Sequence, residues 1–517
     1  MASSALSAVR RARELADLAD DPHVDLVVVG GGVTGTGVAL DAAARGLSVV
    51  LAERADLASG TSRWSSKLVH GGLRYLAHGD VGVAYESAVE RGRIMATIAP
   101  HLCRALPMVL PLTPGISRSA RIQARAGLAA GDLLRLLAWT GRDLLPSARR
   151  LTTAQTLDLV PGVRRDSAGG LLSFDGQLTD DARLVVAIAR TAAAHGAVIL
   201  TRCEASDLTG DGAVLTDRLT GSSLQVSARA VVNAAGVWAG GLAPGVNLQP
   251  SRGAHVVLDA SVLPGLKAGL TVPVPGERAR FVFALPVPGE QRVYIGLTDE
   301  PAEPPDAMLA ALKPTAAEID FLLTTISSVL ATALRPGDVA GSFAGLRPLL
   351  AGRAGSTADL SRRHAVLTAS DGLVTVVGGK LTTYRRMAQD AVDAALTRPV
   401  LSGRAVRPCA TTRLPLVGAA APADLRQIAA PARLVARYGT DAPDVVALAE
   451  SDPRLAKPIA LGVIGAELAF ALQREGALCA DDLLDRRTRI GLVPADRERA
   501  LPEVLALLAE FGQPDAR

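Results

Sequence analysis

The sequence predicts an α/β fold: a parallel sheet flanked by helices, an inserted α+β region with an antiparallel sheet, and a helical C-terminal region. Residues 24–53 have the pattern strand, glycine turn, helix, strand. Strands of the buried type recur at 230–238 and 373–380, each running into glycine. From about residue 400, leucine- and alanine-rich helical patterns replace the strands, with prolines at 408, 415 and 422. These three observations define the fold class.

The chain has 517 residues, which is too long for one compact core and indicates two or three domains. We predict an N-terminal extension, a discontinuous nucleotide-binding domain, an amphipathic insertion, a substrate domain that other parts of the chain complete, and a C-terminal helical domain. The extension covers 1–23, and the nucleotide-binding domain covers 24–105, 151–250 and 335–400. The amphipathic insertion covers 106–150, the substrate domain 251–334, and the C-terminal helical domain 401–517.

The composition is that of a globular protein, with 49% hydrophobic and 21% charged residues, and no apolar run is long enough to span a membrane. The four cysteines lie far apart without metal-ligand spacing, so we expect reduced thiols and no metal site. The first 21 residues lack the features of a secretory signal, which predicts cytoplasmic synthesis. A net charge of +4 with 3% aromatic residues gives no sign of a nucleic-acid surface.

The segment 24–35 is an apolar strand followed by glycines with G-x-G-x-x-G spacing. We assign Gly30 to a tight turn, Gly32 to the close approach of a pyrophosphate, and Gly35 to the packing of the following helix against the strand. The pyrophosphate would lie at the N-terminus of that helix. The pattern predicts a Rossmann-like nucleotide site.

The helix is expected over 36–45 and stops at Gly46, and a second strand over 47–52 leads to Glu53. Glu53 is placed to accept hydrogen bonds from ribose hydroxyls, which disfavours the 2′-phosphate of NADP. The motif does not separate FAD from NAD. The later strand that ends in Ala235 and Gly236 provides a second approach of backbone to the ligand, although it can also be read as an ordinary core strand.

The stretch 61–76 (TSRWSSKLVHGGLRYL) closely resembles the signature that follows the first FAD-binding unit in the FAD-dependent, quinone-linked glycerol-3-phosphate dehydrogenase family. Further stretches resemble this family in the same order: 252–255, 296–299, 345–349, 378–385 and 481–489. The resemblance covers residues 24 to about 490. It implies FAD as cofactor and oxidation of sn-glycerol 3-phosphate to dihydroxyacetone phosphate, with hydride passing from C2 to flavin N5.

The resemblance also assigns cofactor contacts. At the flavin ring system it places Ser59, Ser66, Lys67, Leu68 and Gly72; at the far side of the ring, Gly345, Lys380, Leu381 and Thr382; and at adenine, Ala205.

A phosphate dianion needs several fixed donors, and guanidinium groups bind it bidentately and stay charged. Arg74, Arg347 and Lys380 are the candidates, because each lies beside a glycine turn with apolar flanks. Any single arginine elsewhere in this arginine-rich chain is better explained as a solvated surface charge. Tyr75 and Thr298 lie in the same stretches and are added as substrate contacts.

His255 is the preferred general base, with assistance from Arg347, and His70 is the second catalytic candidate. Imidazole suits proton abstraction near neutral pH, but a hydrogen-bonded structural histidine is the alternative at either position.

Between residues 114 and 150, arginines alternate with leucines, alanines and Trp139, which predicts one or two amphipathic helices. These arginines are Arg118, Arg121, Arg125, Arg135 and Arg142. Such a helix suits a membrane interface with anionic lipids, or packing on its own domain. The family resemblance favours the membrane: it implies a peripheral enzyme on the inner face of the cell membrane that passes electrons to quinone.

Three other functions stay open: an oxidase that gives electrons to oxygen, an amino-acid or amine oxidase of the same fold, and a flavin-binding regulatory or structural protein. A homodimer also stays open. The C-terminal domain is expected to be a cap or partner surface, with Arg486, Arg487 and Arg489 as structural ion-pair formers.

Overall fold

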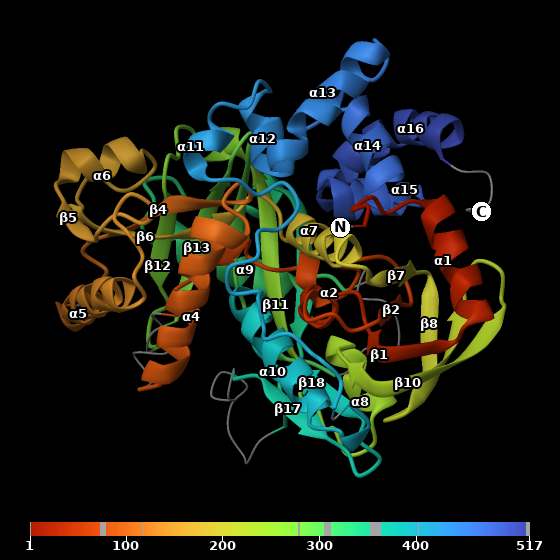
Figure 1. Ribbon diagram of the computed structural model, residues 1–517. Helices are drawn as coiled ribbons and strands as arrows, with labels where there is room; N and C mark the ends of the chain where they lie inside the picture. The colour runs from red at the N-terminus through yellow and green to blue at the C-terminus, as the bar shows by residue number, and fades with distance from the viewer. Residues whose placement is uncertain are drawn as a thin grey trace.

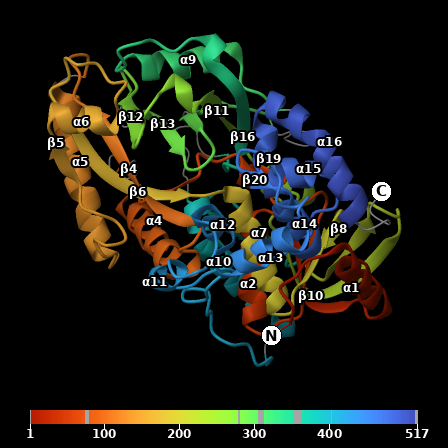
Figure 2. The ribbon, with the colours of Figure 1, turned by 90° about the horizontal axis from the view of Figure 1, so that it is seen from above.

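The structure is a computed structural model, and it describes residues 2–72, 79–116, 118–277, 280–303, 312–351, 363–401 and 403–512. The described residues form two large sheets that lie side by side, a two-stranded hairpin, and a group of C-terminal helices at one end of the molecule (Figures 1 and 2). The predicted fold class is confirmed.

The first sheet has eight strands within the described part of the chain, and its central strands run in the order β18-β10-β1-β2-β7. Strand β1 pairs in parallel with both β2 and β10, and β10 pairs in parallel with β18. The bounds are β1 His23–Val29, β2 Val49–Glu53, β7 Val198–Thr201, β8 Cys203–Thr209, β9 Gly212–Asp217, β10 Ser223–Asn233, β17 Ala365–Thr368 and β18 Val374–Val377. Of the two downstream strands predicted at 230–238 and 373–380, the first therefore lies next to β1 and the second lies next to the first.

Helices cover this sheet because its strands are apolar on both faces. In β1, Leu26 and Val28 pack against the helices, whereas Val27 and Val29 pack on the opposite side. The covering helices are α2 Val33–Ala44, α7 Asp181–Ala194 and α10 Tyr384–Leu396 on one face, and α1 Ala8–Asp20 with the β8–β9 hairpin on the other. Helix α7 follows Asp180, whose carboxylate caps it by accepting from the backbone N–H of Ala182 at 2.9 Å.

The second sheet has ten strands among the described residues and is mostly antiparallel. Its bounds are β3 Leu68–Val69, β4 Cys103–Pro111, β5 Arg149–Leu151, β6 Gly170–Leu178, β11 Ser251–Asp259, β12 Gly269–Pro273, β13 Phe281–Val287, β14 Arg292–Gly296, β15 Glu300–Pro301 and β16 Val339–Arg347. Helices α6 Thr153–Leu159 and α9 Ala316–Ser327 share its hydrophobic core.

The division between the sheets differs from the predicted ranges. Strands β3, β6 and β16 belong to the second sheet, although their residues lie in ranges that we had given to the nucleotide-binding domain, and β4 crosses the boundary that we had placed after residue 105. The reason is long-range pairing: β4 runs parallel to β12, with Met108 opposite Gly269, and no local pattern encodes that register.

The predicted amphipathic insertion contains helix α5, Arg118–Leu137, which lies with α6 at the edge of the molecule farthest from the C-terminal helices (Figures 1 and 2). Helix α4, Val81–Arg93, packs beside it through Val83, Ala84 and Leu134. No helix in the described ranges is both long and apolar enough to cross a membrane.

The C-terminal residues form a helical unit with its own core around Phe470. Its elements are α11 Pro422–Leu425, α12 Ala432–Tyr438, α13 Ala442–Ser451, α14 Gly465–Arg474, α15 Ala480–Asp482, η10 Leu483–Arg487 and α16 Pro494–Phe511, with a short hairpin of β19 Pro458–Ala460 and β20 Val463–Ile464. The hairpin is the one sheet element that the helical pattern did not predict.

Candidate active site

A cavity of about 1050 Å³ is lined by both sheets. One part of its wall comes from the carboxyl ends of β1, β2, β10 and β18, and another from the second sheet and from α5. Ligand pockets usually have volumes of roughly 300–1000 Å³. This cavity is therefore large enough for a long cofactor together with a small substrate.

The glycine turn after β1 has the conformation that its sequence requires. Gly30 has φ +107°, and a Cβ there would lie 2.7 Å from the carbonyl oxygen of Ala234. A Cβ on Gly35 would lie 1.9 Å from the carbonyl oxygen of Gly30, so Gly35 allows α2 to pack on the turn. At Gly32, the residue before α2, a Cβ would approach only Ser62 Oγ, at 3.2 Å. Gly32 thus leaves the helix N-terminus open toward the cavity.

Glu53 ends β2 and lines the cavity. Its Oε2 accepts from Gly31 N–H at 2.6 Å, and its Oε1 accepts from Ala55 N–H at 2.7 Å and from Ser59 Oγ at 3.2 Å. Removal from bulk water raises the pKa of Glu53, and the two backbone donors oppose that rise. A carboxylate has about four acceptor positions, so one remains for a ligand hydroxyl.

These residues fit FAD. The open helix N-terminus suits a pyrophosphate, and the remaining acceptor position of Glu53 suits a ribose hydroxyl. Ala205 lies in the wall near Glu53, as expected for the adenine end. Gly345 and Trp64 also line the cavity and pack closely, because a Cβ on Gly345 would lie 2.4 Å from Cβ of Trp64.

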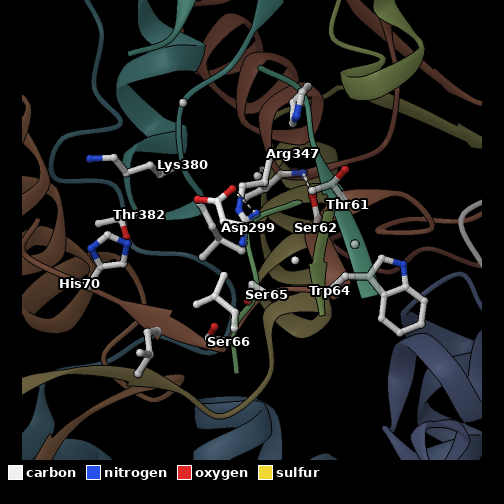
Figure 3. A pocket seen from close by; sticks show the side chains of 18 of the residues that line it. Thr61, Ser62, Trp64, Ser65, Ser66, His70, Asp299, Arg347, Lys380 and Thr382 are labelled. Carbon is white, nitrogen blue, oxygen red and sulfur yellow. Dashed lines mark hydrogen bonds and ion pairs between the residues drawn. The ribbon is translucent and has the colours of Figure 1, made fainter. Parts of the chain in front are cut away.

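Most of the predicted site residues line this one cavity. They are Gly30, Gly32, Glu53, Ser59, Ser66, Leu68, His70, Ala205, Ala235, Gly236, His255, Thr298, Gly345, Arg347, Lys380, Leu381 and Thr382. Figure 3 shows His70, Lys380 and Thr382 on one side of the pocket and Arg347 with Asp299 on the other. Arg74 and Tyr75 lie outside the described residues.

Three predicted cofactor contacts, Gly35, Gly72 and Lys67, are not part of the cavity wall. Lys67 needs a correction: its side chain is buried, and Nζ lies 3.0 Å from Asp181 Oδ2 and donates to the carbonyl of Arg63 at 2.7 Å. Burial lowers the pKa of Lys67, and Asp181 opposes that shift. The lysine side chain is therefore held inside the protein and does not line the cavity.

His255 lies on β11, between Phe343 of β16 and Gly296 of β14. Its ring stacks on Phe343 with centroids 4.6 Å apart, and Nε2 shares a hydrogen bond of 2.8 Å with Ser66 Oγ. Its Nδ1 has no hydrogen-bond partner among the described residues. Burial, followed by the positive charges of Lys67 and Arg347, lowers the pKa of His255 well below its ordinary value. The ring is neutral at pH 7.

Arg347 ends β16, and its guanidinium is held in place by neighbours on β11 and after β14. Nη1 lies 3.1 Å from Ser251 Oγ and 3.2 Å from Asp299 Oδ1, and Nη2 donates to the carbonyl of Thr298 at 3.2 Å. A Cβ on Gly253 would lie 2.3 Å from Nη2, so this glycine makes room for the guanidinium. The result is a fixed cationic group in the cavity wall.

Thr298 and Lys380 also have partners within the protein. The Thr298 hydroxyl accepts from Ala254 N–H at 2.9 Å and donates its proton to Glu318 Oε1 at 2.9 Å. Lys380 Nζ donates to Ser87 Oγ of α4 at 2.8 Å. These contacts position the two side chains at the edge of the cavity.

The sequence reasoning missed several cavity residues. Ser62 accepts from Val33 N–H at 2.9 Å and so links the 61–66 loop to the start of α2. Asp175 accepts from Gly71 N–H at 3.0 Å and from Arg91 Nη1 at 2.7 Å, which anchors the segment that carries His70. Ser62 lies in the recognised signature, but nothing in its position indicates where its hydroxyl points. Asp175 carries no sequence signal that we can identify.

Two family descriptions match nearly the whole chain. Residues 25–385 match "FAD dependent oxidoreductase", and residues 409–515 match "C-terminal domain of alpha-glycerophosphate oxidase". FAD is thus the cofactor of the family to which this cavity belongs.

Individual relatives agree. The chain is 53% identical to glycerol-3-phosphate dehydrogenase 1 of Mycobacterium tuberculosis over 98% of each chain, and 40% identical to glycerol-3-phosphate dehydrogenase 2 of that species, covering 93% of this chain and 84% of the relative. The crystal structure of the Bacillus halodurans glycerol-3-phosphate dehydrogenase complexed with FAD superposes with a TM-score of 0.75 and 29% identity, covering 98% of this chain and 94% of that one. The chain belongs to the FAD-dependent glycerol-3-phosphate dehydrogenase family.

Proposed function

We propose that this protein oxidises sn-glycerol 3-phosphate to dihydroxyacetone phosphate and passes the electrons to a membrane quinone. The observation that carries the proposal is the pair formed by Arg347 and His255, which lie on adjacent strands and line the same cavity as the glycine turn of Gly30 and Gly32. A cationic anchor beside a neutral imidazole is what a phosphorylated alcohol requires. The names of the relatives support the same substrate.

Arg347 would bind the phosphate. Its contacts with Ser251, Asp299 and Thr298 fix the plane of the guanidinium before the substrate arrives, so little side-chain freedom is lost on binding. Lys380 and Arg74 are proposed as further phosphate ligands. Lys380 lies across the pocket from Arg347, on the side of His70 (Figure 3).

His255 would accept the proton of the C2 hydroxyl. Because its pKa lies well below the ordinary value, the imidazole is unprotonated and ready to act as a base at pH 7. Ser66 holds Nε2 in place, and stacking on Phe343 fixes the ring plane. FAD, when bound, supplies the hydride acceptor for the carbon-bound hydrogen.

An anaerobic titration tests the central claim. Addition of sn-glycerol 3-phosphate to the holoenzyme should bleach the visible flavin absorbance, while glycerol and representative amino acids should leave it unchanged. Bleaching by an amino acid instead would support an amine or amino-acid oxidase. Absence of bleaching by any of these compounds would support a non-catalytic flavoprotein.

The proposal of a quinone acceptor rests on the apolar part of the cavity wall beside α5, which we call the apolar arm. Its wall combines Phe174 of β6 and Phe283 of β13 with small residues of α5, among them Ala124 and Gly127. A small phosphorylated alcohol has no use for such a surface, whereas an apolar ring does. The arm therefore suits entry of a quinone from the side of α5.

Gly127 allows this arm to be narrowed. A Cβ at Gly127 would meet nothing within 4 Å, so a Gly127→Phe variant can fill the arm without backbone strain. Stopped-flow reoxidation of the reduced enzyme by a short-chain quinone should slow at least about tenfold, with unchanged flavin reduction by substrate. Gly115→Phe, which also meets nothing and lies outside the cavity wall, is the matched control. Equal rates in all three proteins would argue against the arm as the quinone path.

The rival is an oxidase that uses oxygen, and the match of the C-terminal residues to a glycerophosphate oxidase domain favours it. The same stopped-flow experiment separates the two. Reoxidation by air-saturated buffer that is faster than reoxidation by quinone would establish the oxidase.

Helix α5 is the proposed contact with the inner face of the cell membrane. Leu133, Leu136 and Leu137 are each more than half exposed, and Trp139 is 94% exposed. Two of the predicted basic residues do not fit this surface: Arg135 is buried and bonds Asp132 and Thr140, and Arg121 donates to the carbonyls of Thr113 and Ile116. Arg125 and Arg142 are exposed and remain available for anionic head groups.

Sedimentation with vesicles that contain anionic lipid tests this surface. A triple variant with serine at 133, 136 and 137 should lose most of its binding, because three exposed apolar side chains leave the interface. The control replaces exposed apolar residues elsewhere, Val9→Ser with Leu505→Ser, and should bind like the unaltered protein. Equal binding of both variants would place the membrane contact elsewhere.

A further inference from the structure

The motif at Asp482–Arg489 has no place in the function proposed above, yet its charged side chains reach into the nucleotide-binding part of the molecule. We name this stretch the clamp segment. It follows α15, includes η10, and belongs to the C-terminal helical unit. Its partners lie in the loop 54–66, which joins β2 to the second sheet and forms a wall of the cavity.

The strongest contact is made with Asp56, three residues after Glu53. Asp56 Oδ2 accepts from Arg486 Nε at 2.6 Å and from Arg487 Nη1 at 2.8 Å, and Oδ1 accepts from Arg487 Nη2 at 2.9 Å. Asp56 and Arg487 are each 1% exposed. Burial would raise the pKa of Asp56, but the two arginines outweigh it and keep the carboxylate charged.

Two further contacts hold the same loop. Arg63 Nη1 donates to the carbonyl of Asp485 at 3.4 Å. Arg202 donates its backbone N–H to the carbonyl of Ala55 at 2.7 Å and its side chain to Asp482 at 2.6 Å. The clamp segment thus contacts the beginning of the loop directly at Asp56 and the end of the loop directly at Arg63. A third contact, with Ala55, runs through Arg202.

Arg489 extends the contact to the helix behind the loop. Its Nη2 lies 2.5 Å from Glu290, and its Nε lies 3.6 Å from Asp180, the cap of α7. The next residue, Asp181, accepts from the backbone N–H and the hydroxyl of Ser65. Arg489 therefore supports the end of the loop that carries Ser66.

The loop backbone also indicates that it is held from outside. Ala58 has φ +60° and Lys67 has φ +58°, a region that residues with a Cβ rarely occupy unless their surroundings hold them there. Between these positions the loop supplies Ser59 to Glu53 and Ser62 to the start of α2. A loop that relaxed at Ala58 would release both contacts.

We propose that the clamp segment is a positioning element of the cofactor site: it holds loop 54–66 in the conformation that presents Glu53, Ser59 and Ser62 to FAD. The C-terminal unit then contributes to FAD retention without touching the cofactor. The inference concerns FAD alone, so it stands whatever the substrate or electron acceptor is.

The test compares two arginines that join the C-terminal unit to the rest of the protein. Arg487→Gln removes the bidentate contact with Asp56. Arg190→Gln is the control, because Arg190 of α7 donates to Asp441 of the C-terminal unit at 2.8 Å and, among the described residues, makes no hydrogen bond or ion pair with loop 54–66. The readouts are the FAD dissociation constant, from the fluorescence of FAD released on dilution of the holoenzyme, and the thermal unfolding midpoint.

Both variants should unfold at a lower temperature, but only Arg487→Gln should raise the FAD dissociation constant, by at least about tenfold. Arg486→Lys, which keeps the charge and loses the Nε donor, should fold normally and raise it several-fold. A dissociation constant within twofold of the unaltered protein in Arg486→Lys and Arg487→Gln would overturn the proposal. An equal rise in the Arg190→Gln control would also overturn it, since loss of FAD would then follow general destabilisation.

Discussion

Alanine substitutions at two glycines of the nucleotide-binding turn should have different effects, one on cofactor binding and the other on stability. Gly32 has φ −77°, which alanine adopts freely, and the added Cβ would approach only Ser62 Oγ, at 3.2 Å. Gly35 has no such room, because its Cβ would lie 1.9 Å from the carbonyl oxygen of Gly30. Gly32→Ala is therefore a change in the cavity, and Gly35→Ala is a change in the packing of α2.

The magnitudes follow from these contacts. In Gly32→Ala, a shift of a few tenths of an ångström at Ser62 should cost about 0.5 kcal/mol of unfolding free energy. The methyl group then occupies space that the pyrophosphate needs, at an overpacking cost of about 1–3 kcal/mol. This corresponds to a roughly 5- to 150-fold weaker FAD affinity. In Gly35→Ala the clash is with backbone, so about 3 kcal/mol or more should be lost from folding itself.

Urea unfolding of the two FAD-free variants and a fluorescence titration with FAD measure both quantities. We expect Gly32→Ala to unfold at nearly the urea concentration of the unaltered protein and to bind FAD weakly. Gly35→Ala should unfold at a clearly lower concentration. The reasoning is refuted if Gly32→Ala binds FAD with unchanged affinity, or if both variants lose the same stability.

Three other predictions concern charge. Arg347→Lys should lower kcat/KM for sn-glycerol 3-phosphate by about 100-fold or more in steady-state assays, with FAD content unchanged, because an ammonium cannot replace a bidentate guanidinium; a change below threefold would contradict the phosphate role. Burial, Lys67 and Arg347 lower the pKa of His255, so the rate of flavin reduction should fall on the acidic side only below pH 6.5. Lys67→Met removes one of these positive charges and should move this acidic limb to higher pH. A limb that does not move would exclude His255 as the base. Burial and the charge of Arg183 lower the pKa of His101 to about 3, so below pH 6.5 the unfolded chain binds a proton that the folded chain does not. The free energy of unfolding should therefore fall by up to about 1.4 kcal/mol per pH unit as pH decreases, and urea titrations should give a smaller slope for His101→Gln.

The elements that the sequence predicted well are those whose signals are local. The turn at Gly30 and the strand leading to Glu53 each depend on residues within a few positions of one another. The division between the two sheets depends on pairings such as Met108 with Gly269, which lie far apart in the chain. Alternating strands fit either sheet equally well, so no pattern within β4 or β6 could choose between them.

The sequence predicted the parts of the cavity wall that are formed by glycine backbone better than the parts that are formed by side chains. Gly30, Gly32 and Gly345 lie where their spacing and resemblance place them, because a glycine marks a close approach of chain to ligand. Asp175, in contrast, acts through Gly71 and Arg91, two residues that come from different parts of the fold. Its role becomes visible only when those segments are brought together.

Lys67 shows that a sequence signal can mark a position without showing which protein groups the side chain contacts. Lysine is scarce in this chain, so a lysine within a glycine-flanked signature suggests a specific task, and we expected contact with the flavin ring. The structure instead buries Nζ beside Asp181 and 4.8 Å from the centre of the Phe343 ring, on which His255 stacks. Burial is the main cause of the lowered pKa of His255, and the positive charge of Lys67 lowers this pKa further. The scarcity of lysine correctly indicated that Lys67 makes specific contacts, but the sequence does not show in which direction its side chain points.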